Sequence, residues 1–311
     1  MSNHPEPETP ADRPGGDLER DSDGVPRGQK VLDATLALLD VHQLEVDLYR
    51  GYSPKNAMVR VFGGQVAAQA MVAACRTVPA DRTVHSLHSY FVRPGDPRQP
   101  IDFRVDRTRD GRSFTTRRVV AQQGDQVIFT LSASFQIDEP GLDHQLDIPD
   151  VPDPDSLPTF AELVAGAPDA APWDTLPRPV DIRYVTPPPW SRRSGSPQPG
   201  ARNQVWFKAD GTMPDDPVLH QCLLTYVSDL FLLDSALAAH GINSSARGLQ
   251  MASLDHAVWF HRPIRMDDWV LYDTGSPSAS GARGLAIGSF FSVDGPMLAT
   301  VVQEGLVRLR S

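Results

Sequence analysis

Hydrophobic residues in the first half of the chain follow two different periods. Between residues 30 and 40 they recur at helical spacing, and between residues 44 and 52 they alternate as in a strand. Residues 66–75 form an alanine-rich, almost wholly apolar stretch, which predicts a helix buried on most sides. Four strands separated by glycine-containing turns are predicted after it, at residues 85–92, 101–109, 113–122 and 127–136. The pattern is that of a helix followed by an antiparallel meander.

The second half repeats this order with a longer helix. Strands are predicted at residues 180–185 and 204–209, and Asp216-Pro217 is typical of a helix start, an N-cap followed by proline at the first helical position. We expect this helix to run to Gly241, because glycine commonly ends a helix. Four further strands are then predicted, at residues 249–261, 269–274, 284–292 and 297–308.

The two halves also share short sequences. Tyr90-Phe-Val-Arg-Pro94 resembles Trp259-Phe-His-Arg-Pro263, and a glycine, Gly124 or Gly295, precedes the last predicted strand of each half. Self-similarity of this kind indicates a diverged tandem repeat. Because the apolar face of a sheet needs a covering layer, each half is predicted to wrap an antiparallel sheet around its central helix, the hotdog arrangement. The predicted class is α+β, a tandem (double) hotdog whose two sheets pair edge to edge.

Composition divides the chain further. Residues 1–28 are rich in proline and acidic residues and poor in large apolar side chains, which predicts a disordered acidic tail. Residues 139–178 are rich in proline and aspartate and are predicted to be a linker with one short helix near residues 160–164. The N-terminal hotdog is therefore expected at residues 29–138, and the C-terminal hotdog, which carries the candidate site, at residues 179–311.

Charge and cysteine content exclude several classes of function. The chain has 39 acidic and 29 basic residues and a net charge of -10, so nucleic acid is not an expected partner. Its two cysteines, Cys75 and Cys222, are too few for a disulfide scaffold or a multi-cysteine zinc site and suit a reducing compartment. The sequence contains neither an 18-residue apolar run nor a signal-peptide pattern, so we expect no membrane association and a cytoplasmic location.

A carboxylate lies within the apolar pattern of the second helix. Cys222, Tyr226, Asp229 and Leu233 follow at spacings of four, three and four, which places Asp229 on the stripe expected to face the sheet. Burying a carboxylate is costly unless it is hydrogen-bonded. Asp229 is therefore either a structural acid satisfied by a neighbouring donor or a catalytic residue.

Two strands of the second half also carry polar residues on apolar faces. In the last strand Gln303 is the single large polar residue on the face that contains Ala299 and Val301. In the strand that starts at Leu249, alternation predicts that Ser253 shares a face with Asp255. Each of these features is weak evidence by itself.

The repeat provides an internal control for these residues. Counting eight residues from the turn glycine gives Gln303 in the second half but Ser132 in the first, and the first central helix contains no acid. A carboxylate required by the fold should occur in both copies. The asymmetry favours a functional interpretation of Asp229 over a structural one.

Common signatures of other enzymes are absent from the sequence. It contains no G-x-S-x-G nucleophile elbow, no G-x-G-x-x-G fingerprint and no Walker loop. A serine hydrolase of the α/β type, a Rossmann dinucleotide site and a P-loop site are therefore not expected.

Six motifs, ordered along residues 30–310, together resemble the acyl-CoA thioesterase II family. They are Val61-Phe-Gly-Gly-Gln-Val66, Val84-His-Ser-Leu-His-Ser-Tyr-Phe-Val-Arg-Pro-Gly-Asp96, Arg109-Asp-Gly-Arg-Ser-Phe114, Tyr226-Val-Ser-Asp229, Leu254-Asp-His-Ala-Val-Trp-Phe-His-Arg-Pro263 and Val302-Gln-Glu-Gly305. The resemblance implies a double hotdog enzyme that hydrolyses fatty acyl-CoA to free acid and coenzyme A, with no cofactor and no covalent acyl-enzyme. It also implies that the catalytic residues are Asp229, Ser253 and Gln303, where serine stands in place of the threonine of the bacterial pattern.

The expected mechanism is general base catalysis. Asp229 would accept a proton from a water that Ser253 and Gln303 hold against the thioester carbonyl. Backbone N–H groups of Gly63 and Gly64 are candidates for stabilising the oxyanion, although tight packing of the helix against the sheet also explains two glycines there.

Acyl-CoA is the expected partner, and its phosphates require basic residues. Candidates are grouped around one predicted hairpin and are also typical of a solvated surface: Arg107, Arg109, Arg112, Arg117 and Arg118. Exposed sheet edges and the resemblance predict a homo-oligomer, a dimer or a tetramer.

Two other functions stay open at this point. One is a non-catalytic acyl-CoA binding protein. The other is a hotdog hydratase or dehydratase that would use Asp255 and His256, although adjacent strand residues point in opposite directions.

Overall fold

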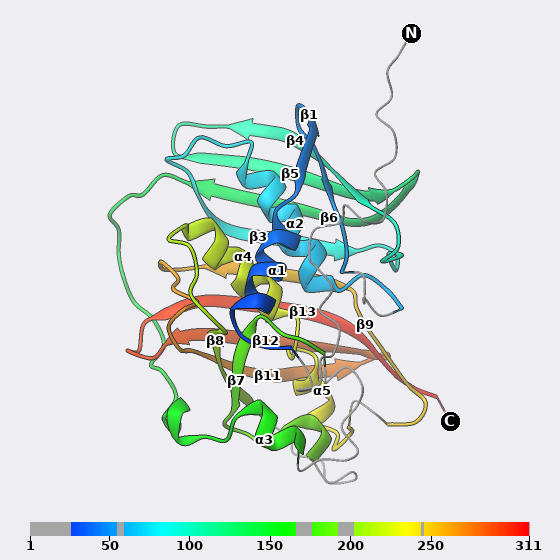
Figure 1. Cartoon of the computed structure of the whole chain (residues 1–311), viewed down its shortest axis with the longest axis vertical. Helices are drawn as coiled ribbons and strands as arrows, with labels where there is room; N and C mark the ends of the chain where they lie inside the picture. Colours follow the sequence, from blue (N-terminus) through cyan, green and yellow to red (C-terminus); the bar gives the residue numbers. More distant parts are fainter. Residues whose placement is uncertain (1–25, 55–58, 166–175, 192–201, 244–245, 311) are drawn as a thin grey trace.

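A computed structural model describes residues 26–54, 59–165, 176–191, 202–243 and 246–310 (Figure 1). Nearly all of the predicted acidic tail, residues 1–25, lies outside the described residues. In the described part of the chain, no helix is long and apolar enough to cross a membrane.

In its described residues, the first half contains two helices and six strands. Helix α1, Gln29–Leu39, precedes helix α2, Gly63–Cys75, which is buried along almost its whole length because its side chains are small and apolar. The strands are β1 (His42–Glu45), β2 (Leu48–Gly51), β3 (Thr83–Phe91), β4 (Ile101–Asp110), β5 (Phe114–Gln123) and β6 (Gln126–Gln136). The helix and the four strands agree with the sequence prediction, but only β4, β5 and β6 form a meander, because β3 pairs with β6 and not with β4.

The single strand predicted at residues 44–52 is wrong. The chain turns between Glu45 and Leu48, and β1 and β2 form an antiparallel hairpin. The turn residue Asp47 has a φ of 60°, a left-handed conformation that aspartate tolerates better than most residues.

The second half has the same plan with more elements. Its strands are β7 (Val180–Tyr184), β8 (Arg202–Ala209), β9 (Leu249–Ser253), β10 (Asp255–Phe260), β11 (Val270–Ser280), β12 (Arg283–Ser292) and β13 (Met297–Leu309). Its helices are α4 (Pro217–Ser228) and α5 (Asp234–Ala238). The uninterrupted helix predicted up to Gly241 is therefore wrong, because the chain leaves the helix at Asp229 and forms turns before α5.

The strands of both halves form one antiparallel sheet. Their order is β1-β2-β4-β5-β6-β3-β10-β13-β12-β11-β8-β7, and β9 pairs with β13 beside β10. The halves meet where β3 pairs with β10, with Leu87 opposite Val258 and Ser89 opposite His256. This pairing confirms the predicted edge-to-edge arrangement and the double hotdog fold.

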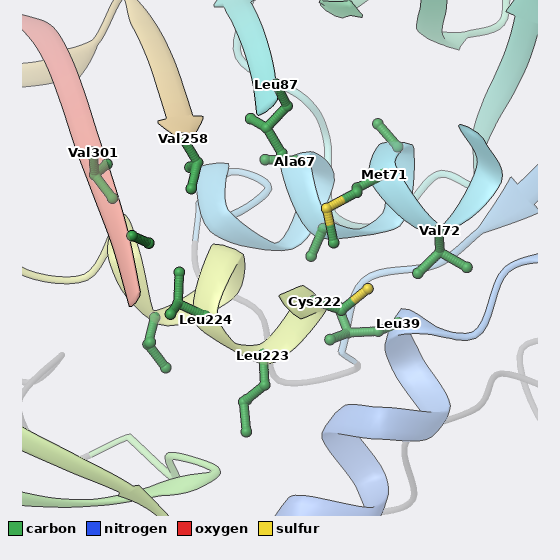
Figure 2. Packing of buried hydrophobic residues seen from close by; sticks show 14 of the residues in the cluster. Leu39, Ala67, Met71, Val72, Leu87, Cys222, Leu223, Leu224, Val258 and Val301 are labelled. Atoms are coloured by element: carbon green, nitrogen blue, oxygen red, sulfur yellow. The ribbon is translucent and has the colours of Figure 1, made fainter. Parts of the chain in front are cut away.

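The helices fill the space enclosed by the sheet. In Figure 1, α1, α2 and α4 lie at the centre of the view between strands of the two halves. Helix α2 contacts β3, β4, β5 and β6 and packs against α4, while α5 contacts β8, β11 and β12. Figure 2 shows Ala67 and Met71 of α2 and Leu224 of α4 in one cluster that also includes Val258 and Val301 of the sheet. One hydrophobic core therefore spans both halves.

Part of the segment predicted as a linker packs on the second half. A 3-10 turn, Pro154–Ser156, and helix α3, Phe160–Ala165, lie within it. Ile148, Val151 and Leu157 cover a small apolar cluster that contains Trp206 and Phe291. The Trp206 indole also donates to the carbonyl of Pro152 at 3.1 Å.

Candidate active site

Asp229 lies at the C-terminal end of α4, facing the N-terminal end of α2. The Asp216 side chain caps the start of α4 and Pro217 occupies its first turn, as the sequence predicts. The helix ends at Ser228, and Asp229 follows with helical dihedral angles as the C-cap residue. Asp229 is therefore the C-cap residue of α4 and not a residue inside a longer helix, but its carboxylate faces the sheet as predicted, because Gln303 of β13 and Ser253 of β9 both contact it.

Three donors converge on the Asp229 carboxylate. Gln303 Nε2 donates to Oδ1 at 2.7 Å, and Ser253 Oγ donates to the same oxygen at 3.4 Å. The backbone N–H of Gly64, in the first turn of α2, donates to Oδ2 at 2.8 Å. The structure thus brings together all three residues predicted from the sequence and adds a fourth residue, Gly64, from the other half of the chain.

The surroundings of Asp229 change its acidity. Burial raises the pKa of Asp229 to about 6, because the charged carboxylate is poorly solvated there, while the hydrogen bonds from Gln303, Gly64 and Ser253 act in the opposite direction. Asp229 nevertheless keeps partial contact with solvent. Such a carboxylate is ionised at neutral pH and is basic enough to accept a proton.

Ser253 reaches this site because of a β-bulge. Ser253 of β9 pairs with Gly305, and Ala257 of β10 pairs with Val302. The three residues 254–256 therefore lie opposite only two residues of β13, 303 and 304, which is a β-bulge. The bulge reverses the alternation. Ser253 and the buried residue His256 consequently lie on the same helix-facing side of the sheet.

The prediction that Ser253 shares a face with Asp255 is therefore wrong, because it assumed one regular strand. Asp255 instead accepts a hydrogen bond from the backbone N–H of Glu304 at 2.7 Å.

Gln303 lies on the inner face of β13 and is fully buried, as alternation predicts. Its Nε2 is bound to Asp229, whereas its buried Oε1 has no hydrogen-bond partner among the described residues. Gln303 therefore presents one free acceptor beside the carboxylate.

Comparison of the two repeats still shows the glutamine in one copy only, but the residue of the first half that is equivalent to Gln303 is not the predicted one. Tyr90 pairs with Thr130 as Trp259 pairs with Thr300, so the structural counterpart of Gln303 is Ala133, not Ser132. The count from the turn was wrong because Thr130 is six residues after Gly124 whereas Thr300 is five after Gly295. Ala133 is buried and apolar, and the glutamine occurs in one copy only.

The two glycines at the start of α2 allow the helices to approach. A Cβ on Gly64 would overlap the carbonyl oxygen of Tyr226 in α4, and a Cβ on Gly63 would lie 2.6 Å from Asp229 Oδ2. Close packing therefore explains both glycines, and it involves the end of α4 as well as the sheet, because a Cβ on Gly63 would also lie 2.9 Å from the Phe91 ring of β3. Gly64 was not predicted as a partner of Asp229, because a backbone donor leaves no side-chain signal in the sequence.

Two of the arginines considered for phosphate binding have other partners. Arg117 is buried and donates to Thr77 and Asp110. Arg107 forms an ion pair with Asp47 at 3.0 Å.

Metal-binding side chains do not cluster in the described residues: no group of three or more His, Cys, Asp or Glu could hold a metal ion there. Cys75 and Cys222 are free thiols, and burial raises the pKa of both.

Comparisons with known proteins agree with this architecture. Residues 52–136 match the family model for the acyl-CoA thioesterase N-terminal domain, and residues 178–306 match that for acyl-CoA thioesterase. The chain is 37% identical to acyl-CoA thioesterase 2 of Haemophilus influenzae, over 89% of this chain and 98% of that protein. It is 36% identical to acyl-coenzyme A thioesterase 8 of Homo sapiens, over 98% of this chain and 97% of that protein.

A solved structure gives the same result. The acyl-CoA thioesterase II TesB2 of Mycobacterium marinum superimposes with a TM-score of 0.74 and 46% identity, covering 88% of this chain and 98% of that one. The chain therefore belongs to the acyl-CoA thioesterase II family and is a thioester hydrolase.

Proposed function

We propose that this enzyme hydrolyses fatty acyl-CoA with Asp229, Ser253 and Gln303 as catalytic residues and without a covalent acyl-enzyme. The observation that carries the proposal is the Asp229 carboxylate, whose pKa burial raises to about 6 and which both Gln303 and Ser253 contact. A base with a pKa slightly below the working pH is ionised and still takes up a proton readily.

In the proposed reaction Asp229 removes a proton from a water molecule as that water attacks the thioester carbonyl carbon. Gln303 supports this role because its Nε2 orients the carboxylate and its unpaired Oε1 can accept a hydrogen bond from the same water. Collapse of the tetrahedral intermediate then breaks the carbon–sulfur bond and releases the fatty acid and the coenzyme A thiol.

Ser253 supplies a hydroxyl to the same carboxylate oxygen that Gln303 contacts. Its 3.4 Å contact with Asp229 is long, which supports a role as a second hydrogen-bonding group for the water rather than as a nucleophile. The N-terminal end of α2 adds a favourable dipole for negative charge near the reacting carbonyl.

Release of free thiol from acyl-CoA esters tests the proposal, with chain lengths from acetyl to palmitoyl. We expect Asp229→Asn to lose about 10²- to 10⁴-fold in kcat, because it removes the general base. A matched control is Asp273→Asn, which alters another buried carboxylate with a raised pKa, in β11, and should keep wild-type turnover.

Wild-type turnover by Asp229→Asn would contradict the assignment of the base. If the folded wild type bound acyl-CoA without hydrolysing any ester, the protein would be a binding protein instead. The domain boundaries, the homo-oligomeric state and a cytoplasmic location stay predictions from the sequence.

A further inference from the structure

A buried histidine contacts Ser228, the residue that precedes Asp229 in the chain. His256 of β10 is completely buried, and its Nε2 lies 2.8 Å from the Oγ of Ser228, the last residue of α4. The Ser228 hydroxyl donates to the carbonyl of Thr225 at 2.9 Å, so it accepts from the imidazole, which therefore carries its proton on Nε2. Burial lowers the pKa of His256 to about 4, and the ring is neutral at physiological pH.

Ser228, at the end of α4, makes a second contact with the sheet through its backbone. Tyr272 of β11 donates its hydroxyl to the carbonyl oxygen of Ser228 at 3.0 Å. That carbonyl belongs to the peptide bond between Ser228 and Asp229. His256 and Tyr272 therefore fix the side chain and the peptide group next to the Asp229 carboxylate.

The tandem repeat shows that the fold does not need a histidine here. Aligning Tyr90 with Trp259 places Leu87 of β3 at the position of His256, and Leu87 is also completely buried. The bulge is common to both halves, since β3 also shifts register between Val84 and Ser86. The same alignment places Val84 at the position of Ser253. At both positions the half that carries the candidate site has a polar residue, His256 or Ser253, where the first half has an apolar one.

His256 is also an unfavourable choice for stability. Its Nδ1 is buried and has no hydrogen-bond partner among the described residues. An unpaired buried polar atom costs free energy of folding, and leucine would avoid that cost. His256 is unfavourable for packing and is present in one copy only. A role in the candidate site therefore explains its presence better than a role in the hydrophobic core.

We infer that His256 is a positioning residue, which holds the C-terminal end of α4 through Ser228 so that the Asp229 carboxylate stays aligned with Ser253 and Gln303. The inference rests on the proposed role of Asp229. Small displacements of a catalytic group lower turnover more than substrate binding.

The test compares His256→Leu and His256→Gln with wild type. His256→Leu should keep or raise the thermal unfolding midpoint, lower kcat at least about tenfold and leave KM nearly unchanged. His256→Gln keeps an N–H group that can reach Ser228 Oγ and should restore most of kcat. Ser228→Ala removes the other partner, and should lower kcat without adding to the effect of His256→Leu in the double variant.

His220 provides a matched control on the same helix. It is also buried and neutral, but it lies in the first turns of α4, where its Nδ1 accepts from the backbone N–H of Met266 at 3.0 Å. His220→Leu should lower the unfolding midpoint, because it leaves that N–H without a partner, and should not change kcat. The inference is overturned if His256→Leu keeps wild-type kcat, if His256→Gln loses as much as His256→Leu, or if His220→Leu loses equally.

A second measurement separates this inference from the proposed function. The pKa of the Asp229 carboxyl, followed by carbon-13 NMR without substrate, should rise in His256→Leu and stay unchanged in His220→Leu. The reason is that the hydrogen bonds from Gln303, Gly64 and Ser253 keep this pKa lower and depend on alignment. An unchanged pKa in His256→Leu would contradict the positioning role even if no acyl-CoA were hydrolysed.

Discussion

At the scale of single residues, the chemistry of the site follows from one partly buried carboxylate. Asp229 has hydrogen bonds to Gln303, Ser253 and the Gly64 amide, and desolvation still raises its pKa. The balance matters because the hydrogen bonds lower the pKa and make the carboxylate a weaker base, whereas burial raises the pKa and favours the protonated form.

This balance predicts the pH dependence of hydrolysis. Since the base must be ionised, kcat/KM, which depends on the ionisation of the free enzyme, should be half-maximal near pH 6 and fall about tenfold for each further pH unit towards acid. The rate of thiol release between pH 4.5 and 8 measures this, with circular dichroism at each pH as the control for folding. An acid limb centred near pH 4, the usual range of aspartate, would contradict the role given to burial.

Burial and alternation identified Asp229 and Gln303 from the sequence, but the reasoning for Ser253 was only partly right. The residue does reach the site, yet the predicted face was wrong. A bulge depends on how two strands pair, and hydrophobic alternation along one strand cannot reveal it.

At the scale of elements, the site depends on the close approach of α2 and α4. The Gly64 N–H can reach Asp229 because no side chain separates the start of α2 from the end of α4. The sequence predicted where α4 starts but extended this helix beyond its end, since apolar residues continue through the turns between α4 and α5. Periodicity alone does not distinguish a helix from a buried turn of similar composition.

We expect Gly64→Ala to damage both stability and activity. The added methyl group would overlap the Tyr226 carbonyl, which is backbone and cannot move aside cheaply, so the free energy of unfolding should fall by about 1–3 kcal/mol. Activity should fall as well, because the helices separate and the Gly64 N–H leaves Asp229.

Urea unfolding and thiol release measure the two effects. Gly275→Ala in β11 is the control, since nothing lies within 4 Å of the added Cβ, and its effect should stay within about 0.5 kcal/mol. Equal stability of the Gly64→Ala and Gly275→Ala variants would contradict the packing described for α2 and α4.

At the scale of the whole molecule, the two halves form a single structural unit. Strands β3 and β10 join them into one sheet, α2 packs against α4, and one hydrophobic core includes residues of both halves. The site is composite too, because the first half contributes the Gly64 amide and the second half contributes the three side chains.

This architecture predicts one cooperative unfolding transition for the two halves. Urea denaturation followed by tryptophan fluorescence and by far-UV circular dichroism should give coincident curves with loss of hydrolysis at the same midpoint. Two separated transitions would instead show that each half has an independent core.

The sequence by itself determined the tandem order of helices and strands, the polar residues of the site and their presence in one copy only. These features are local, since they depend on hydrophobic period, turn residues and the comparison of two repeats. The tertiary structure decided the bulge that turns Ser253 inward, the end of α4 at Asp229, and the contacts of Gly64 and His256 with that helix end. Those depend on strand pairing and on backbone groups from residues far apart in the chain, neither of which has a pattern in the local sequence.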